Sequence, residues 1–120
     1  MIKNEAEKAY RNAMKEAISG LIDEETGFAT TQRKQFADGC HVFGALSEEW
    51  FEAQYNLKEL EYFVEGFQTN CLSGDMPDET EVNAYLLDIR EQCERAVMEI
   101  IQIAAVATKA KETLPDWINE

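Results

Sequence analysis

The sequence has few of the residues that interrupt regular structure and few positive charges. Six glycines and two prolines in 120 residues leave too little turn-forming sequence for an all-β fold, since sheet-rich domains need frequent Gly and Pro turns. Eleven Lys and Arg stand against 24 Asp and Glu, which gives a formal net charge of −13. A surface this acidic repels phosphate backbones and anionic headgroups, so we expect no direct nucleic-acid binding and no docking on a membrane.

Cysteines and long apolar runs are scarce as well. Cys40, Cys71 and Cys93 match neither a disulfide framework nor a CxxC metal or redox motif. No apolar run approaches the roughly 18 residues that cross a membrane, and the opening MIKNEAEKAY lacks the apolar core of a signal peptide. Because 45% of the residues are hydrophobic, the chain is too apolar for a disordered acidic tail. We therefore expect one cytoplasmic all-α domain over residues 1–120.

Hydrophobic periodicity predicts the first two helices. The first is expected over residues 2–22, and the polar residues 23–31 that follow it are expected to connect it to the second. The second helix begins as early as Thr31 and ends near residues 66–77. Its apolar seam advances in steps of three and four, which is typical of a helix that packs along a partner. The residues of this seam are Phe43, Leu46, Trp50, Ala53, Leu57, Leu60, Val64 and Phe67.

The third predicted helix starts between Asp75 and Asp78 and ends at Pro115. Its seam consists of Val82, Leu86, Ile89, Cys93, Ala96, Ile100, Ile103, Ala107, Ala110 and Leu114. Both seams are expected to be core. Since a short loop joins the second and third helices, we expect a long antiparallel helix hairpin. Residues 100–107 (IIQIAAVA) are apolar nearly all round, which favours a helical bundle completed by oligomerisation.

A cluster of glutamates is expected at one level of this hairpin. Glu48, Glu49 and Glu52 form an EExxE pattern whose spacing of three and four residues places them on neighbouring stripes of one helix. If the hairpin turns at residues 73–75, position 50 faces position 98, and Glu99 joins the same level. A solvated acidic turn is the simpler interpretation, because a Glu-rich chain produces such a pattern by chance.

Convergence of these carboxylates favours a metal site. Like charges held close together in an apolar bundle are unfavourable unless a cation neutralises them. Oxygen donors suit a hard cation such as Mg²⁺, with Mn²⁺ as the alternative, and Mg²⁺ keeps waters and bridges to substrate phosphates. A protein with this net charge would then bind a polyphosphate through metal bridges rather than through direct contacts.

The two segments resemble the all-α nucleoside triphosphate pyrophosphohydrolases of the MazG-like group. The sequence pattern is more similar still to that of small phage-type members of the group. In those proteins a HxxYxxLxEExxE-like stretch precedes a helix with the pattern ExIQxAAxAxxAxE. Here residues 41–52 read HVFGALSEEWFE and residues 99–112 read EIIQIAAVATKAKE. At the last position of the family's second motif, ExxD, this chain has Gln102 in place of Asp.

The resemblance implies a helical-bundle homo-oligomer, a dimer or a tetramer, that uses Mg²⁺ to split a nucleoside triphosphate into the monophosphate and pyrophosphate. The metal ligands that it implies are Glu49, Glu52, Glu99 and Gln102, and it makes Glu48 a supporting carboxylate that positions the attacking water.

Two other functions stay open. One is a MazG-like scaffold that has lost turnover and binds a nucleotide or a protein, because the neutral Gln102 removes a charge from the site. The other is an acidic helical inhibitor that blocks a basic groove. Binding of a divalent ion would separate the first two functions from the inhibitor, and pyrophosphate release would separate the enzyme from the lapsed scaffold.

For several other conspicuous residues we expect a structural role. Trp50 and Cys93 are expected in the core because they lie on the seams. Cys71 is expected in an exposed loop, and His41, the only histidine, is expected to be a partly buried helix residue. The cations kept as candidates for phosphate contact are Arg33, Lys34 and Arg95.

Overall fold

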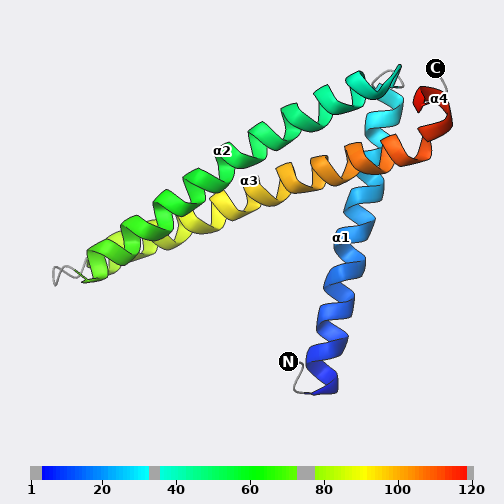
Figure 1. Ribbon diagram of the computed structural model, residues 1–120. Helices are drawn as coiled ribbons and strands as arrows, with labels where there is room; N and C mark the ends of the chain where they lie inside the picture. Colours follow the sequence, from blue (N-terminus) through cyan, green and yellow to red (C-terminus); the bar gives the residue numbers. More distant parts are fainter. Residues whose placement is uncertain (1–3, 33–35, 73–77, 119–120) are drawn as a thin grey trace. The chain divides into compact units, whose positions relative to one another are not determined.

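The structure, a computed structural model, describes residues 4–32, 36–72 and 78–118. Within these ranges the chain forms α1 (Glu5–Gln32), α2 (Gly39–Leu72), α3 (Glu79–Glu112) and the short α4 (Leu114–Ile118), and it contains no strand (Figure 1). This confirms the all-α prediction. None of the helices in the described ranges combines the length and the apolarity that crossing a bilayer requires.

The chain divides into two compact units. Unit 1 contains residues 1–46 and 101–120, and therefore α1, the first turns of α2, the last turns of α3, and α4. Unit 2 contains residues 47–100, which form the greater part of α2 and α3. A single domain over the whole chain stays a prediction.

Each of the three long helices begins with an Asn or Asp cap. The side-chain Oδ1 atoms of Asn4, Asp38 and Asp78 accept the backbone N–H three residues later, at 2.8, 2.8 and 2.9 Å. Such a cap satisfies a helix N–H that has no partner in its own helix, and it contributes about 1 kcal/mol. The cap at Asp78 lies in the range predicted for the start of the third helix, whereas the predicted turn at 73–75 and Pro77 lie outside the described residues.

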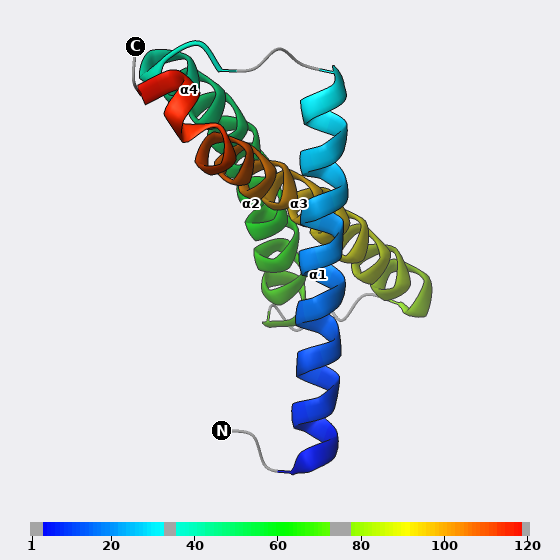
Figure 2. The ribbon, with the colours of Figure 1, turned by 90° about the vertical axis from the view of Figure 1, so that its right-hand side faces the viewer.

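The connection predicted over residues 23–31 is wrong, because α1 continues through it to Gln32 (Figure 2). The Gly27 that was expected to form a turn lies inside the helix, where a Cβ would meet no atom within 4 Å. An interior glycine destabilises a helix by only about 1 kcal/mol relative to alanine, so one glycine does not end it. Thr26 also stays within the helix pattern and donates its hydroxyl to the carbonyl of Ile22 at 2.7 Å.

The other helix ends also differ from the prediction. α2 begins at Gly39, after the capping Asp38, rather than near Thr31, and it continues beyond Gly66 to Leu72. Pro115 is not the residue at which the third helix, α3, ends. α3 stops at Glu112, and Pro115 is the second residue of α4, a position in the first turn where proline fits because its missing N–H needs no partner.

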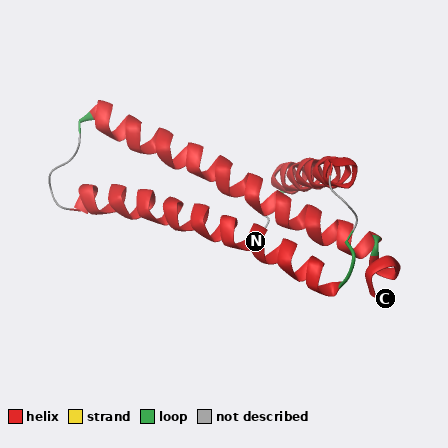
Figure 3. Cartoon of the chain, turned by 90° about the horizontal axis from the view of Figure 1, so that it is seen from above, coloured by secondary structure: helices red, strands yellow, loops and turns green. Residues whose placement is uncertain are grey.

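Within unit 2, α2 and α3 lie side by side and run in opposite chain directions (Figure 3). The side-chain amide of Gln92 donates to the backbone oxygen of Asn56 at 2.9 Å and to its Oδ1 at 3.0 Å. Closer to the connecting loop, the ring of Phe67 lies 5.8 Å from that of Tyr85, and Asn70 hydrogen-bonds the Tyr85 hydroxyl. These contacts set position 56 against position 92 and position 67 against position 85.

The buried apolar residues of unit 2 are small. Ala53 is 0% exposed and Ala96 is 4% exposed, whereas Trp50 on the same seam is 52% exposed. Two helices in contact cover only one side of each other, so the larger seam residues remain open in this chain. The predicted core positions of Trp50 and Cys93 are therefore wrong, since both are exposed. Cys71 is also corrected, because it lies in α2 and is half-buried.

In unit 1 a small cluster joins the start of α2 to the end of α3. Its buried members are Phe36, Val42, Val106 and Ala110, with Ala45 and Leu46 packed against them. The Lys109 side chain, 3% exposed, lies with its ammonium 4.7 Å from the centre of the Phe36 ring. A cation above an aromatic face is stabilised by the ring quadrupole, which accounts for a lysine at this apolar site.

Candidate metal centre

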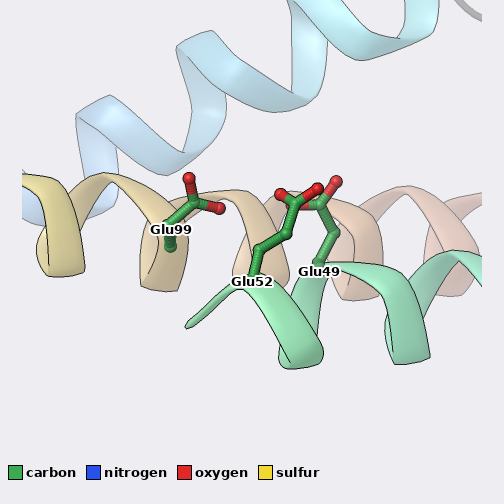
Figure 4. A group of neighbouring side chains, drawn as sticks. All are labelled: Glu49, Glu52 and Glu99. Carbon is green, nitrogen blue, oxygen red and sulfur yellow. The ribbon is translucent and has the colours of Figure 1, made fainter. Parts of the chain in front are cut away.

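Three glutamates from two helices of unit 2 converge at one place. Glu49 and Glu52 project from α2, and Glu99 projects from α3 toward the same side (Figure 4). One carboxylate oxygen from each lies within 4.8 Å of the corresponding oxygens of the other two. The sequence analysis predicted that position 50 on the second helix faces position 98 on the third. The three side chains meet at this height along the two helices.

The three carboxylates differ in their exposure to solvent. Glu49 is 6% exposed, Glu99 is half-buried and Glu52 is exposed. The burial of Glu49 follows from the helix pattern, because it lies four residues before Ala53, the most buried position of α2. Burying a carboxylate is unfavourable unless hydrogen bonds, a proton or a cation compensate for the lost water, so the buried position of Glu49 depends on such compensation.

The electrostatics of the cluster raise the pKa of Glu99 above its ordinary value of 4.5. The largest cause is the loss of water around its carboxyl group on burial, followed by the negative charge of Glu52. A hydrogen bond to Glu52 and the charge of Glu49 add to the effect. All of these disfavour the ionised form of the Glu99 carboxyl and so raise its pKa.

The spacing of the three carboxylates is close to, and somewhat wider than, that of oxygen ligands around a small divalent cation. Oxygens bound to Mg²⁺ at about 2.0–2.1 Å lie about 2.9 Å apart when adjacent and about 4.2 Å apart when opposite. The donor oxygens here lie within 4.8 Å of one another, so binding of one such ion by all three carboxylates would require them to move closer together. Donation by three carboxylates suits a hard cation, whereas softer metals prefer sulfur or imidazole.

The other predicted site residues are placed differently. Glu48 is exposed on α2 and does not belong to the cluster of Glu49, Glu52 and Glu99. Gln102 lies on α3, three residues after Glu99, and is half-buried in unit 1. The structure thus brings together three of the five predicted residues, and their role as metal ligands stays a prediction.

Of the residues considered for phosphate contact, the structure describes His41 and Arg95. His41 is exposed rather than half-buried, and its Nδ1 accepts the backbone N–H of Ala37 at 3.2 Å, next to the Phe36 ring. Arg95 is exposed on α3. Arg33 and Lys34 lie outside the described residues.

The Asn56–Gln92 pair is a part of this region that the sequence pattern did not reveal. Asn56 lies one turn after Glu52, and its side-chain amide donates to the Glu52 backbone oxygen at 3.1 Å. Gln92, which holds Asn56 from α3, is only 3% exposed. Gln92 stands beside Cys93 and is not on the predicted seam, so periodicity gives no signal for it. The pair sets the register that brings Glu99 to Glu52.

Comparison with known proteins adds no assignment. The chain matches no protein-family model, no curated protein and no solved structure. The functional interpretation therefore rests on the geometry of the cluster and on the sequence patterns of residues 41–52 and 99–112.

Proposed function

We propose that this protein is a Mg²⁺-dependent nucleoside triphosphate pyrophosphohydrolase that releases a nucleoside monophosphate and pyrophosphate. The observation that carries the proposal is the convergence of Glu49, Glu52 and Glu99 from two helices, with one of the three carboxylates buried. Such a group binds a divalent cation, and a cation is what an acidic protein needs in order to hold a triphosphate.

In this proposal Glu49 and Glu52 hold Mg²⁺ from α2, and Glu99 holds it from α3 as the ionised carboxylate. When bound, Mg²⁺ supplies polarisation of the phosphoryl group and neutralises charge that develops on the phosphates. Glu48 precedes Glu49 on α2 and is exposed, and in this proposal its carboxylate accepts a proton from the attacking water. Gln102 contributes an amide oxygen in place of the aspartate of the family motif.

The proposed fold is the antiparallel hairpin of α2 and α3 within a homo-oligomeric bundle, a dimer or a tetramer, of the small phage-type MazG-like group. The contacts of Asn56 with Gln92 and of Phe67 with Tyr85 support the hairpin. The exposure of Trp50 (52%) on its seam supports a further subunit, because a large apolar face open to water is covered in a stable bundle. We place the reaction in the cytoplasm, where nucleoside triphosphates and Mg²⁺ are available.

The direct test is pyrophosphate release from a panel of canonical and modified nucleoside triphosphates. We expect release with Mg²⁺ or Mn²⁺, none with chelator, and its loss in Glu49→Gln. Glu61→Gln is the matched control, because Glu61 is an exposed glutamate of the same helix outside the cluster. Equal turnover in wild type and Glu49→Gln would contradict the proposal.

Gln102 favours a second candidate function, a MazG-like protein that binds a nucleotide without turning it over. An amide has no negative charge and is a weaker ligand for Mg²⁺ than a carboxylate. This candidate predicts metal-dependent nucleotide binding with no pyrophosphate release, and it predicts that Gln102→Asp creates or increases turnover. The acidic-inhibitor alternative predicts that no divalent ion binds at the cluster.

A further inference from the structure

An open pocket lies in unit 2, toward the end of α2 and the start of α3. Its volume is about 410 Å³, which falls within the usual range of small-molecule sites. The lining includes the aromatic residues Tyr62 and Phe63 from α2 and Tyr85 from α3. Glu65 supplies its charge, and none of the described residues that line the pocket is Lys or Arg. The lining is therefore mainly aromatic and carries negative charge.

Ring contacts and a hydrogen bond hold this lining together. The ring of Tyr85 lies 5.8 Å from that of Phe67, and the Tyr85 hydroxyl is hydrogen-bonded to Asn70, which also lines the pocket. The rings of Tyr62 and Phe63 lie 6.0 Å apart in an edge-on arrangement. Because these contacts fix rings of both helices, the walls exist before a ligand arrives, and less side-chain entropy is lost on binding.

A glycine keeps the pocket open on the side of α2. Gly66 belongs to the lining, one turn after Tyr62 and one turn before Asn70. An added Cβ at Gly66 would meet no atom within 4 Å, so a larger side chain at this position has room to enter the pocket. The size of the pocket therefore depends on residue 66, which can be changed without a clash.

The charge around the pocket selects a cation. Residues 59–89, the part of the chain that contains the whole lining, hold eight Asp and Glu and no Lys, Arg or His. Such a segment repels anions and attracts cations. Hard metal ions take several oxygen ligands, whereas Glu65 supplies the one carboxylate among the described lining residues. Aromatic rings attract organic cations through their quadrupole, so this lining suits an organic cation better than a metal ion.

We propose that this pocket binds a quaternary ammonium group, with its methyl groups against the aromatic rings and its charge balanced by Glu65. A quaternary ammonium needs no hydrogen-bond acceptors, which a mainly aromatic lining does not offer in number. The group comes either from a free small molecule or from a trimethylated lysine of a peptide. The site is separate from the proposed metal centre, because Tyr62 lies ten residues after Glu52, or about 15 Å along α2.

Nuclear magnetic resonance titration of the isotope-labelled full chain tests the proposal. The ligands are choline and dimethylbutanol, its neutral isostere, in which carbon replaces the ammonium nitrogen. We expect choline to shift the Gly66 backbone amide and the Asn70 side-chain amide, and we expect the isostere to bind at least about fivefold more weakly, as loss of a cation–π contact predicts. Equal binding of the two ligands, or no binding of choline and of the peptide described next, would overturn the proposal.

A short peptide with one trimethyllysine, compared with the same peptide carrying lysine, distinguishes the two sources of the group. Tighter binding of the trimethyllysine peptide than of choline would identify a protein side chain as the ligand. Tighter binding of choline would identify a free small molecule. Both results support the quaternary ammonium site, whereas a preference for the unmethylated peptide would contradict it.

Substitutions locate the binding in this pocket. Tyr62→Ala and Glu65→Gln are each expected to weaken choline binding about two- to fivefold. Tyr55→Ala and Glu61→Gln are the matched controls, because both residues are exposed on α2 and do not line the pocket. Gly66→Leu is expected to abolish binding while the melting temperature stays at or above that of wild type, since leucine is the better helix former. Unchanged choline binding in Gly66→Leu would contradict the proposal, whatever the outcome of the pyrophosphate assay.

Discussion

The carboxyl group of Glu99 on α3 is hydrogen-bonded to that of Glu52 on α2. Two carboxyl groups form such a bond when one of them keeps a proton, and the same bond contributes to the raised pKa of Glu99. A proton and a metal ion are alternative ways to relieve the same repulsion. If the cluster binds a cation as proposed, the pair links the protonation of the site, the stability of unit 2 and the binding of that cation.

Glu99→Gln is expected to stabilise the metal-free protein at neutral pH. Because the pKa of Glu99 is raised in the folded state, its proton-linked stabilisation is fully present below the ordinary value of 4.5 and is lost as the pH rises through the raised pKa. The amide cannot ionise and avoids that loss. We expect the melting temperature of Glu99→Gln to exceed that of wild type at pH 7.5 with chelator, and the difference to shrink toward pH 4.

Circular dichroism melts across this pH range check the prediction, with Glu61→Gln as the control for removal of an acidic side chain. A variant that melts below wild type at pH 7.5 without metal would show that the ionised Glu99 stabilises the fold, contrary to the account.

Divalent-ion affinity is expected to fall on acidification. A cation binds the ionised carboxylate, so binding to protein in which Glu99 is protonated must release that proton. The affinity for the cation should therefore be lower at pH 5 than at pH 7.5. The difference should be larger than for a site whose glutamates all have the ordinary pKa. Calorimetric titrations with Mg²⁺ in buffers of different ionisation enthalpy measure the released proton. Binding without proton uptake or release at pH 5 would contradict the role of Glu99.

Gln92→Ala is expected to lower the free energy of unfolding by about 1–3 kcal/mol, because it leaves the buried amide contact of Asn56 unmade. Gln92 is 3% exposed and bonds both oxygens of Asn56. Urea unfolding of Gln92→Ala, Asn56→Ala and the double variant measures the coupling between them. The contact predicts that the double variant loses less than the sum of the single ones, whereas additive losses would mean that the two side chains do not interact.

Gly20→Ala and Gly27→Ala are each expected to stabilise the protein by about 0.5–1 kcal/mol, since alanine is the better helix former. An added Cβ meets no atom within 4 Å at either position, so no clash offsets the gain. Ala13→Gly, an exposed position of the same helix, should show the opposite change in urea unfolding. A destabilised Gly27→Ala would indicate that residues 23–31 form a turn, as the sequence pattern suggested.

The level at which the glutamates meet could be predicted from the sequence, because both seams advance in helical steps and a hairpin pairs positions by counting back from its turn. The small buried residues Ala53 and Ala96 also lie on those seams. The exposure of Trp50 could not be predicted, since a helical period shows which residues share a face but not how many helices cover that face.

The turn-forming residues of the sequence predicted an end of α1 that is too early in the chain. The run at residues 23–31 combines acids, threonines and Gly27, which favour turns, yet every residue in it also tolerates a helix at a small energetic penalty. The contact between Asn56 and Gln92 joins residues that are 36 positions apart in the sequence. Hydrophobic periodicity does not predict such a contact, because both side chains are polar. The pairing of Glu52 with Glu99 was predictable only because both belong to recognisable acidic patterns.

Binding of Mn²⁺ followed by electron paramagnetic resonance at pH 7.5 tests the central claim most directly, because it observes the cation without requiring turnover. The account predicts one site per chain in wild type and in Glu61→Gln, and an affinity at least about tenfold lower in Glu49→Gln, by analogy with the loss of supporting groups at metal sites. Equal affinity in all three proteins, or no binding to wild type, would contradict a metal centre at Glu49, Glu52 and Glu99.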